Sequence, residues 1–111
     1  MPSDDCVPFG ADCHVRLGAG LISHTWDPVV LATLRGGAAP RRDLLRSIGG
    51  ISDKSLHESL VRLIDAGLVS RVADSGSTYD LTPLGTSFAT GPLLALARWA
   101  EEHAVDLVGA A

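Results

Sequence analysis

The segment from residue 50 to residue 69 constrains the fold most, because it marks both ends of one helix. Ser52 is a good N-cap, since its hydroxyl can accept a hydrogen bond from an unpaired amide in the first turn. Asp53 follows at the positive end of the helix dipole, and Gly67 is the residue type that ends helices in a left-handed conformation. The buried stripe is predicted from four apolar residues at i, i+4, i+7 and i+8, namely Leu56, Leu60, Leu63 and Ile64.

The opposite face of this helix is predicted to point outward. At about 100° per residue, that face carries Lys54, Ser55, Glu58, Val61, Arg62 and Asp65. A short helix with a polar outer face, preceded by another helix and followed by a strand, is typical of a recognition helix that enters a DNA groove.

Three helices are predicted before residue 50, after an N-terminal arm at 1–12. The first covers residues 13–22, and the second begins near Thr25 to Pro28 and ends at Gly36, with Thr25 or Asp27 as its cap. The third follows Pro40 and ends at Gly49, so residues 49–52 form a tight helix-to-helix turn. Their predicted core residues are Trp26, Val29, Val30, Leu31, Leu34, Leu44, Leu45 and Ile48.

A hairpin is predicted after residue 67, with strands at 68–72 and 78–81 around the turn cluster 74–77. Thr82 and Pro83 then read as N-cap and first residue of a last helix. Gly91-Pro92 should interrupt that helix, whose pattern continues to about Asp106. The whole, residues 13–111, is a mainly α domain with a small β-hairpin, namely a winged helix-turn-helix with dimerisation helices at both ends.

Composition limits the function classes. The 111 residues carry a net charge of −4, which is low for a nucleic-acid binder but compatible with one basic face. No apolar run reaches the roughly 18 residues that span a bilayer, and no signal peptide is visible. We therefore expect a cytoplasmic protein without membrane contact. A mean hydropathy of +0.24 in so short a chain suggests apolar surface that is covered by a second subunit.

The chain resembles the HxlR family of bacterial winged-helix transcription regulators, which is related in fold to MarR-type proteins. The resemblance extends from about Cys13 to Trp99. The matching positions are Cys13, Trp26, Leu31, Leu34, Leu44, Gly50-Ile51-Ser52, Lys54, Leu56, Leu60, Leu63, Gly67-Leu68-Val69, Arg71, Tyr79-Asp80-Leu81-Thr82 and Gly85. The resemblance implies a DNA-binding regulator, interpreted here as a repressor, that acts as a homodimer on a pseudo-palindromic operator.

Predicted contacts to double-stranded DNA fall into two groups. Residues of the recognition helix would face the major groove, and arginines would fix the position of the protein on phosphates. The groove group is Ser52, Lys54, Ser55, His57 and Glu58, and the phosphate group is Arg41, Arg42, Arg46, Arg62 and Arg71.

The dimer interface is predicted on apolar residues of the first and last helices, namely Val15, Leu17, Leu21, Ile22, Leu93, Leu96, Ala97, Trp99 and Ala100. Trp26 and Trp99 could line a pocket for a small effector near that interface. An alternative hypothesis is a winged-helix module with weak or lost DNA affinity that senses an effector or binds a protein partner. The acidic balance, Glu58 and the short hairpin favour that alternative.

The remaining chemistry is sparse. Cys6 and Cys13 should be reduced in a cytosolic chain, and Cys13 matches a family cysteine that serves redox sensing in some members. For Cys13, a buried and inert thiol is the alternative. The histidines lack the spacing of metal ligands, and no catalytic or nucleotide-binding motif is present. We therefore predict no metal, no cofactor and no enzymatic activity.

Overall fold

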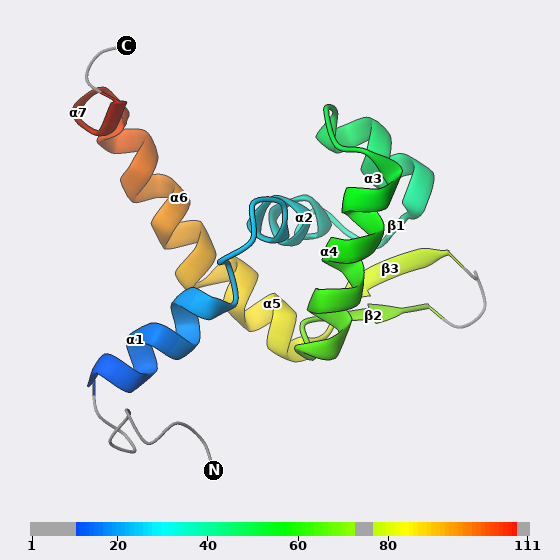
Figure 1. The fold of residues 1–111 in the computed structure, drawn as a ribbon, viewed down its shortest axis with the longest axis horizontal. Coiled ribbons are helices and arrows are strands. Elements are labelled where there is room, and N and C mark those ends of the chain that lie inside the picture. The colour runs from blue at the N-terminus through cyan, green and yellow to red at the C-terminus, as the bar shows by residue number, and fades with distance from the viewer. Residues whose placement is uncertain (1–10, 73–76, 109–111) are drawn as a thin grey trace.

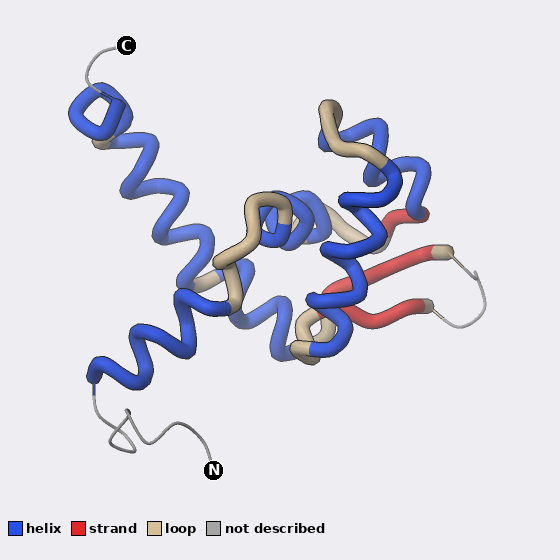
Figure 2. The backbone as a smooth tube through the Cα atoms, viewed as in Figure 1, coloured by secondary structure: helices blue, strands red, loops and turns tan. Residues whose placement is uncertain are grey.

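The computed structural model describes residues 11–72 and 77–108, which form a helical body with one small sheet (Figures 1 and 2). The helices are α1 (Ala11–Gly20), α2 (Asp27–Leu34), α3 (Arg41–Ile48), α4 (Asp53–Asp65), α5 (Pro83–Thr90), α6 (Pro92–Glu102) and α7 (Ala104–Val108). The strands are β1 (Ala39–Pro40), β2 (Val69–Arg71) and β3 (Thr78–Leu81). The predicted arm at 1–12 lies almost wholly outside the described residues. The predicted winged helix-turn-helix order is confirmed.

The core lies where α2, α3, α4 and the sheet meet. It consists of Val30, Leu31, Leu34, Leu44, Ile51, Leu56, Leu60, Leu63, Leu68, Val69, Tyr79, Ala89 and Leu93. The predicted stripe of α4 is confirmed for Leu56, Leu60 and Leu63, but it is wrong for Ile64, which is 37% exposed. Ile64 lies about 80° around the helix from Leu56, at the margin of the stripe. Val29 is also 37% exposed, because it projects from the side of α2 opposite Leu34.

The sheet has the order β1-β3-β2 and is antiparallel throughout. The hairpin of β2 and β3 was predicted, although β2 is shorter than the predicted strand at 68–72. The predicted turn at 74–77 lies mostly outside the described residues. Sequence reasoning missed β1, which pairs Ala39 with Tyr79, because a two-residue strand that ends in proline gives no alternating pattern.

Helix caps hold the connections in place. Ser52 caps α4 as predicted, and Thr82 caps α5 with its hydroxyl 2.9 Å from the amide of Gly85. The prediction of Thr25 or Asp27 as the cap of α2 is wrong: Trp26 occupies that position without a side-chain cap. Asp27 instead points inward, toward α4. The interruption at Gly91-Pro92 is confirmed and separates α5 from α6.

The first helix and the last two helices extend away from the body. In Figure 1, α1 and the α6–α7 arm diverge on the side opposite the hairpin. α1 begins two residues earlier than predicted, at Ala11. None of the described helices has both the length and the apolar character needed to cross a membrane.

Candidate DNA-binding surface

The turn before α4 presents the start of that helix to solvent. Gly49 and Gly50 both have positive φ angles, +67° and +70°, which residues with a side chain rarely adopt. The two glycines therefore allow the chain to reverse within two residues. Ile51 then anchors the turn in the core. The hydroxyl of Ser52 accepts a hydrogen bond from the amide of Ser55 at 3.0 Å. The sequence thus fixes where α4 begins and which residues its first turns expose.

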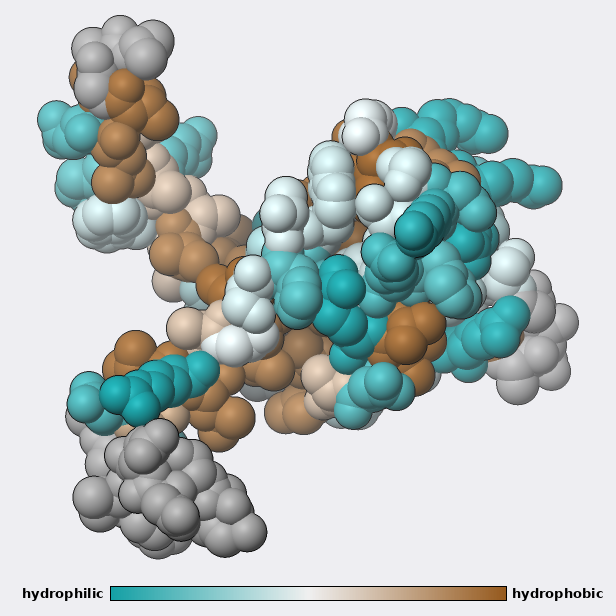
Figure 3. All heavy atoms as spheres, in the orientation of Figure 1, coloured by the Kyte–Doolittle hydropathy of each residue, from teal (hydrophilic) through white to brown (hydrophobic). Residues whose placement is uncertain are grey.

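The first two turns of α4 carry most of the predicted groove residues on an accessible face. Ser52, Lys54, His57 and Glu58 are exposed, and Ser55 is half-buried. Hydrophilic side chains cover much of the α3–α4 part of the body in Figure 3, whereas hydrophobic ones gather on α1 and the α6–α7 arm. The structure therefore places the predicted groove residues together on a polar surface.

A buried ionic network locks α4 against α2. Asp27, 3% exposed, accepts hydrogen bonds from Ser59 Oγ at 2.6 Å and from Arg62 Nε and Nη2 at 3.1 and 3.0 Å. The hydrogen bond to Asp27 raises the pKa of the Arg62 guanidinium above its ordinary value, despite some loss of hydration. Arg62 thus uses two of its nitrogens to hold the helix in place, so we leave it out of the proposed phosphate contacts.

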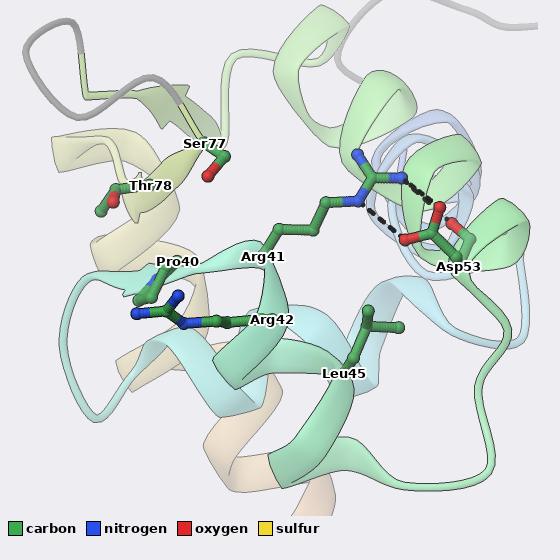
Figure 4. A pocket seen from close by; sticks show the side chains of 7 residues that line it. All are labelled: Pro40, Arg41, Arg42, Leu45, Asp53, Ser77 and Thr78. Atoms are coloured by element: carbon green, nitrogen blue, oxygen red, sulfur yellow. Dashed lines mark hydrogen bonds and ion pairs between the residues drawn. The ribbon is translucent and has the colours of Figure 1, made fainter.

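The start of α3 is joined to the start of α4 by a second ion pair (Figure 4). Arg41 Nε and Nη2 donate to the two carboxylate oxygens of Asp53 at 2.9 and 3.2 Å, and Nη2 also reaches the Asp53 carbonyl at 3.2 Å. The hydrogen bond to Asp53 raises the pKa of Arg41, and the same bond lowers the pKa of Asp53 below 3.8. Sequence reasoning gave Asp53 only a role in the helix dipole and missed this pairing.

Arg41 and Asp53 border an open cleft of about 610 Å³ between α3, α4 and the start of β3. Its lining is Pro40, Arg41, Arg42, Leu45, Asp53, Ser77 and Thr78. The backbone holds the cleft together, since the amide of Arg41 donates to the carbonyl of Ser77 at 2.9 Å. The cleft brings cations and hydroxyls to one edge of the polar surface.

The other predicted cations differ in how they are held. The side chains of Arg42 and Arg46 are 83% and 76% exposed and share Asp43 at 4.0 and 3.5 Å, distances typical of weak surface pairs. Arg71, on β2, lies with its guanidinium carbon 5.9 Å from the ring centroid of Tyr79. Arg42 and Arg46 can therefore leave Asp43 at little cost, and Arg71 adds a cation from the hairpin.

The predicted dimer residues are mostly accessible. Val15, Leu17, Leu96, Ala97 and Trp99 are exposed, and Leu21, Ile22 and Ala100 are half-buried. The prediction of Leu93 as an interface residue needs correction. Leu93 is only 6% exposed, because it packs into the core of its own chain, so it has little surface left for a partner.

The predicted tryptophan pocket does not bring its two rings together. Trp26 packs against the core, whereas Trp99 lies on α6 and stacks on His103 at 4.5 Å. The cleft between α2 and α6, about 380 Å³, is lined by neither ring.

The expected reduced state of Cys13, and the alternative of a buried and inert thiol, need correction, whereas its role in redox sensing stays a prediction. Cys13 is disulfide-bonded and half-buried, so neither the reduced thiol nor the buried thiol is found. The reduced thiol was expected from the reducing conditions of the cytosol and not from the positions of the cysteines in the fold. Cys6 lies outside the described residues. Within the described residues, no three histidine, cysteine or acidic side chains gather as metal ligands would.

The comparisons with known proteins match this geometry. A family model described as HxlR-like helix-turn-helix matches residues 21–106. The chain belongs to the HxlR-like helix-turn-helix family. It is 35% identical over 97 residues to the HTH-type transcriptional regulator YtfH of Escherichia coli strain K12, covering 84% of this chain and 76% of YtfH. This is a family of helix-turn-helix transcriptional regulators.

Solved structures of HxlR- and MarR-type regulators have the same fold. The transcriptional regulator ytfH from Salmonella typhimurium superimposes with a TM-score of 0.71 and 31% identity, over 93% of this chain and 95% of that one. The quinone-bound YodB from Bacillus subtilis gives a TM-score of 0.72 over 81% of this chain and 98% of YodB. At 23% identity, the likeness to YodB concerns the fold alone.

Proposed function

We propose that this HxlR-like protein binds double-stranded DNA through α4 and represses transcription as a homodimer. The observation that carries the proposal is the geometry of α4: the Asp27 network locks its buried side, while its capped first turns stay exposed. In helix-turn-helix proteins, the second helix of the motif lies in the major groove with its N-terminal residues at the base edges. The proposed base contacts are Ser52, Lys54, Ser55, His57 and Glu58.

Phosphate contacts are proposed for Arg42, Arg46 and Arg71, and for Arg41 after it leaves Asp53. These side chains come from α3 and β2, the two elements on either side of α4 in the chain. Such contacts fix the position of the protein and carry no sequence information. Glu58 is exposed on α4, and its proposed role is to accept a hydrogen bond from a cytosine amino group.

Homodimerisation is supported by apolar side chains on the two diverging ends. Val15 and Leu17 on α1 are 67% and 71% exposed, and Trp99 on α6 is 50% exposed. Exposed apolar surface of this kind is typical of subunit interfaces. A two-fold dimer would place two copies of α4 in successive major grooves, about one helical turn apart, which requires a pseudo-palindromic operator.

Selection from random DNA duplexes tests the proposal. The full chain should enrich a pseudo-palindrome whose half-sites are about 10 base pairs apart. Lys54→Ala should weaken binding to the selected duplex, because it removes a cation from the exposed start of α4. The matched control is Arg98→Ala, which removes one exposed cation from α6 and should leave the affinity within about twofold. Enrichment of no sequence, or equal losses in both variants, would refute the assignment of α4.

A second candidate function is the response to a small apolar effector, supported by the cleft between α2 and α6. Its volume of about 380 Å³ is within the usual range for small-molecule sites. The lining is Pro28, Val29, Ala32, Thr33, Arg35, Leu93 and Ala97. A neighbour of the same fold, YodB, was solved with quinone bound.

A benzoquinone titration tests the effector hypothesis. The quinone should lower the affinity of the wild type for its selected duplex, and Ala97→Trp should abolish the response by filling the cleft. An equal response in Ala97→Trp, or none in the wild type, would rule out this cleft as the effector site.

A further inference from the structure

The contact between Arg41 and Asp53 joins two parts of the proposed DNA surface. Arg41 is the first residue of α3, and Asp53 is the first residue of α4. Two nitrogens of the guanidinium face the two carboxylate oxygens, as Figure 4 shows, which is the strong bidentate geometry. The carboxylate is 68% exposed, so Asp53 itself stands on the accessible surface next to Ser52 and Lys54.

This arrangement sets Asp53 and DNA in competition for one cation. The cleft beside Arg41 is open and also lined by Arg42, Ser77 and Thr78, which are groups that suit a phosphate. A phosphate in the cleft and the Asp53 carboxylate are both negative, so they would compete for the guanidinium of Arg41. The Asp53 carboxylate is 68% exposed, so water screens the ion pair from that side. A phosphate offers the same bidentate geometry to the guanidinium and can therefore replace the carboxylate on Arg41.

We infer that Asp53 sets the affinity of the DNA-binding surface. In the free protein Asp53 holds Arg41 in an ion pair, and on binding a phosphate of the DNA backbone replaces Asp53 as the partner of Arg41. The inference rests on the proposed function of α4. It adds a residue that makes binding weaker than the cations alone would give. The inference also explains how Arg41 can contact a phosphate although Asp53 occupies its guanidinium in the free protein.

The inference is tested by Asp53→Asn, which keeps the size of the side chain and removes its charge. The full chain should bind its selected duplex roughly fivefold more tightly, the equilibrium equivalent of the upper range for an exposed ion pair. The slope of log K against log salt should become steeper by about 0.9 for each protomer in which Arg41 newly neutralises a phosphate. Circular dichroism at the assay temperature confirms that the variant is folded.

A double-mutant cycle separates this account from simple repulsion between Asp53 and DNA. If Asp53 acts by holding Arg41, then Asp53→Asn should have no effect on affinity in an Arg41→Gln background. Equal tightening in both backgrounds would overturn the inference, and so would no tightening in the wild-type background. Asp43→Asn is the matched charge control, since Asp43 contacts its arginines only at 3.5 and 4.0 Å, and it should tighten binding less.

The same cycle distinguishes the inference from the proposed function. Salt-dependent binding by the wild type without an effect of Asp53→Asn leaves α4 as the DNA-binding helix and refutes the role of Asp53. Binding by Asp53→Asn alone supports the inference in its strongest form. No binding by any variant refutes the proposed function, and the inference with it.

Discussion

Replacing Arg62 by Met tests how α4 is held. The substitution keeps much of the apolar stem but removes the guanidinium from Asp27, which is 3% exposed and keeps only its bond to Ser59. Breaking a buried ion pair from one side costs about 3–5 kcal/mol, because the remaining charge is buried without compensation. The Arg62 side chain is 35% exposed, so water screens part of this interaction and we expect about 2–3 kcal/mol.

The measurement is urea unfolding at pH 7, followed by tryptophan fluorescence, since Trp26 immediately precedes Asp27. The double variant Asp27→Asn/Arg62→Met buries no charge and should recover most of the loss, leaving about 1 kcal/mol. A loss below about 0.5 kcal/mol for Arg62→Met, or no recovery in the double variant, would refute the argument.

The same variant separates support from contact. If Arg62 only holds α4, folded Arg62→Met should bind DNA with an unchanged salt slope. If Arg62 binds a phosphate, the slope should become shallower by about 0.9 for each phosphate that is no longer neutralised. The second result would restore Arg62 to the phosphate contacts.

Further predictions concern single positions. Gly85→Ala should lower stability by about 1–3 kcal/mol or more in thermal unfolding, because a Cβ there would lie 1.9 Å from the Leu68 carbonyl oxygen; unchanged stability would show that α5 can move. Ser52→Ala should cost about 1 kcal/mol through loss of the cap, and a Ser52→Asp variant should recover it. Since the pKa of Asp53 is lowered on folding, its contribution to stability is present above pH 3.8 and is lost as pH falls through the lower, folded pKa. Asp53→Asn and wild type should therefore differ at pH 7 and converge in urea unfolding once the pH is below the folded pKa of Asp53.

The helices and hairpin were predictable because each carries local signals. Ser52, Gly67 and the leucines of α4 state where that helix begins, ends and faces, and these signals act within a few residues. The family resemblance added the connection of the elements. The failure at Ile64 comes from a wheel position at the margin of the buried stripe, where the neighbouring elements decide burial. Val29 failed for another reason: a run of consecutive apolar residues in α2 does not show which side of the helix faces the core.

The ion pairs were not predictable, because they join residues that are far apart in sequence. Asp27 and Arg62 are separated by 35 positions, and Arg41 and Asp53 by 12. An acidic residue at a helix start is read equally well as a cap, a dipole contact or an ion-pair partner. Its role is decided by the neighbouring helix, which is α4 for Asp27 and α3 for Asp53. For this reason the sequence placed Arg62 with the phosphate contacts and left Asp53 out.

The salt dependence of DNA binding tests the central claim most directly. The measurement is the affinity of the full chain for the selected duplex between 50 and 200 mM salt. With Arg42, Arg46 and Arg71, and with or without Arg41, a dimer makes about six to eight phosphate contacts, so log K should fall with a slope of about −5 to −7. That slope corresponds to a loss of about a thousandfold or more over the range. An affinity that does not change between 50 and 200 mM salt would contradict the account.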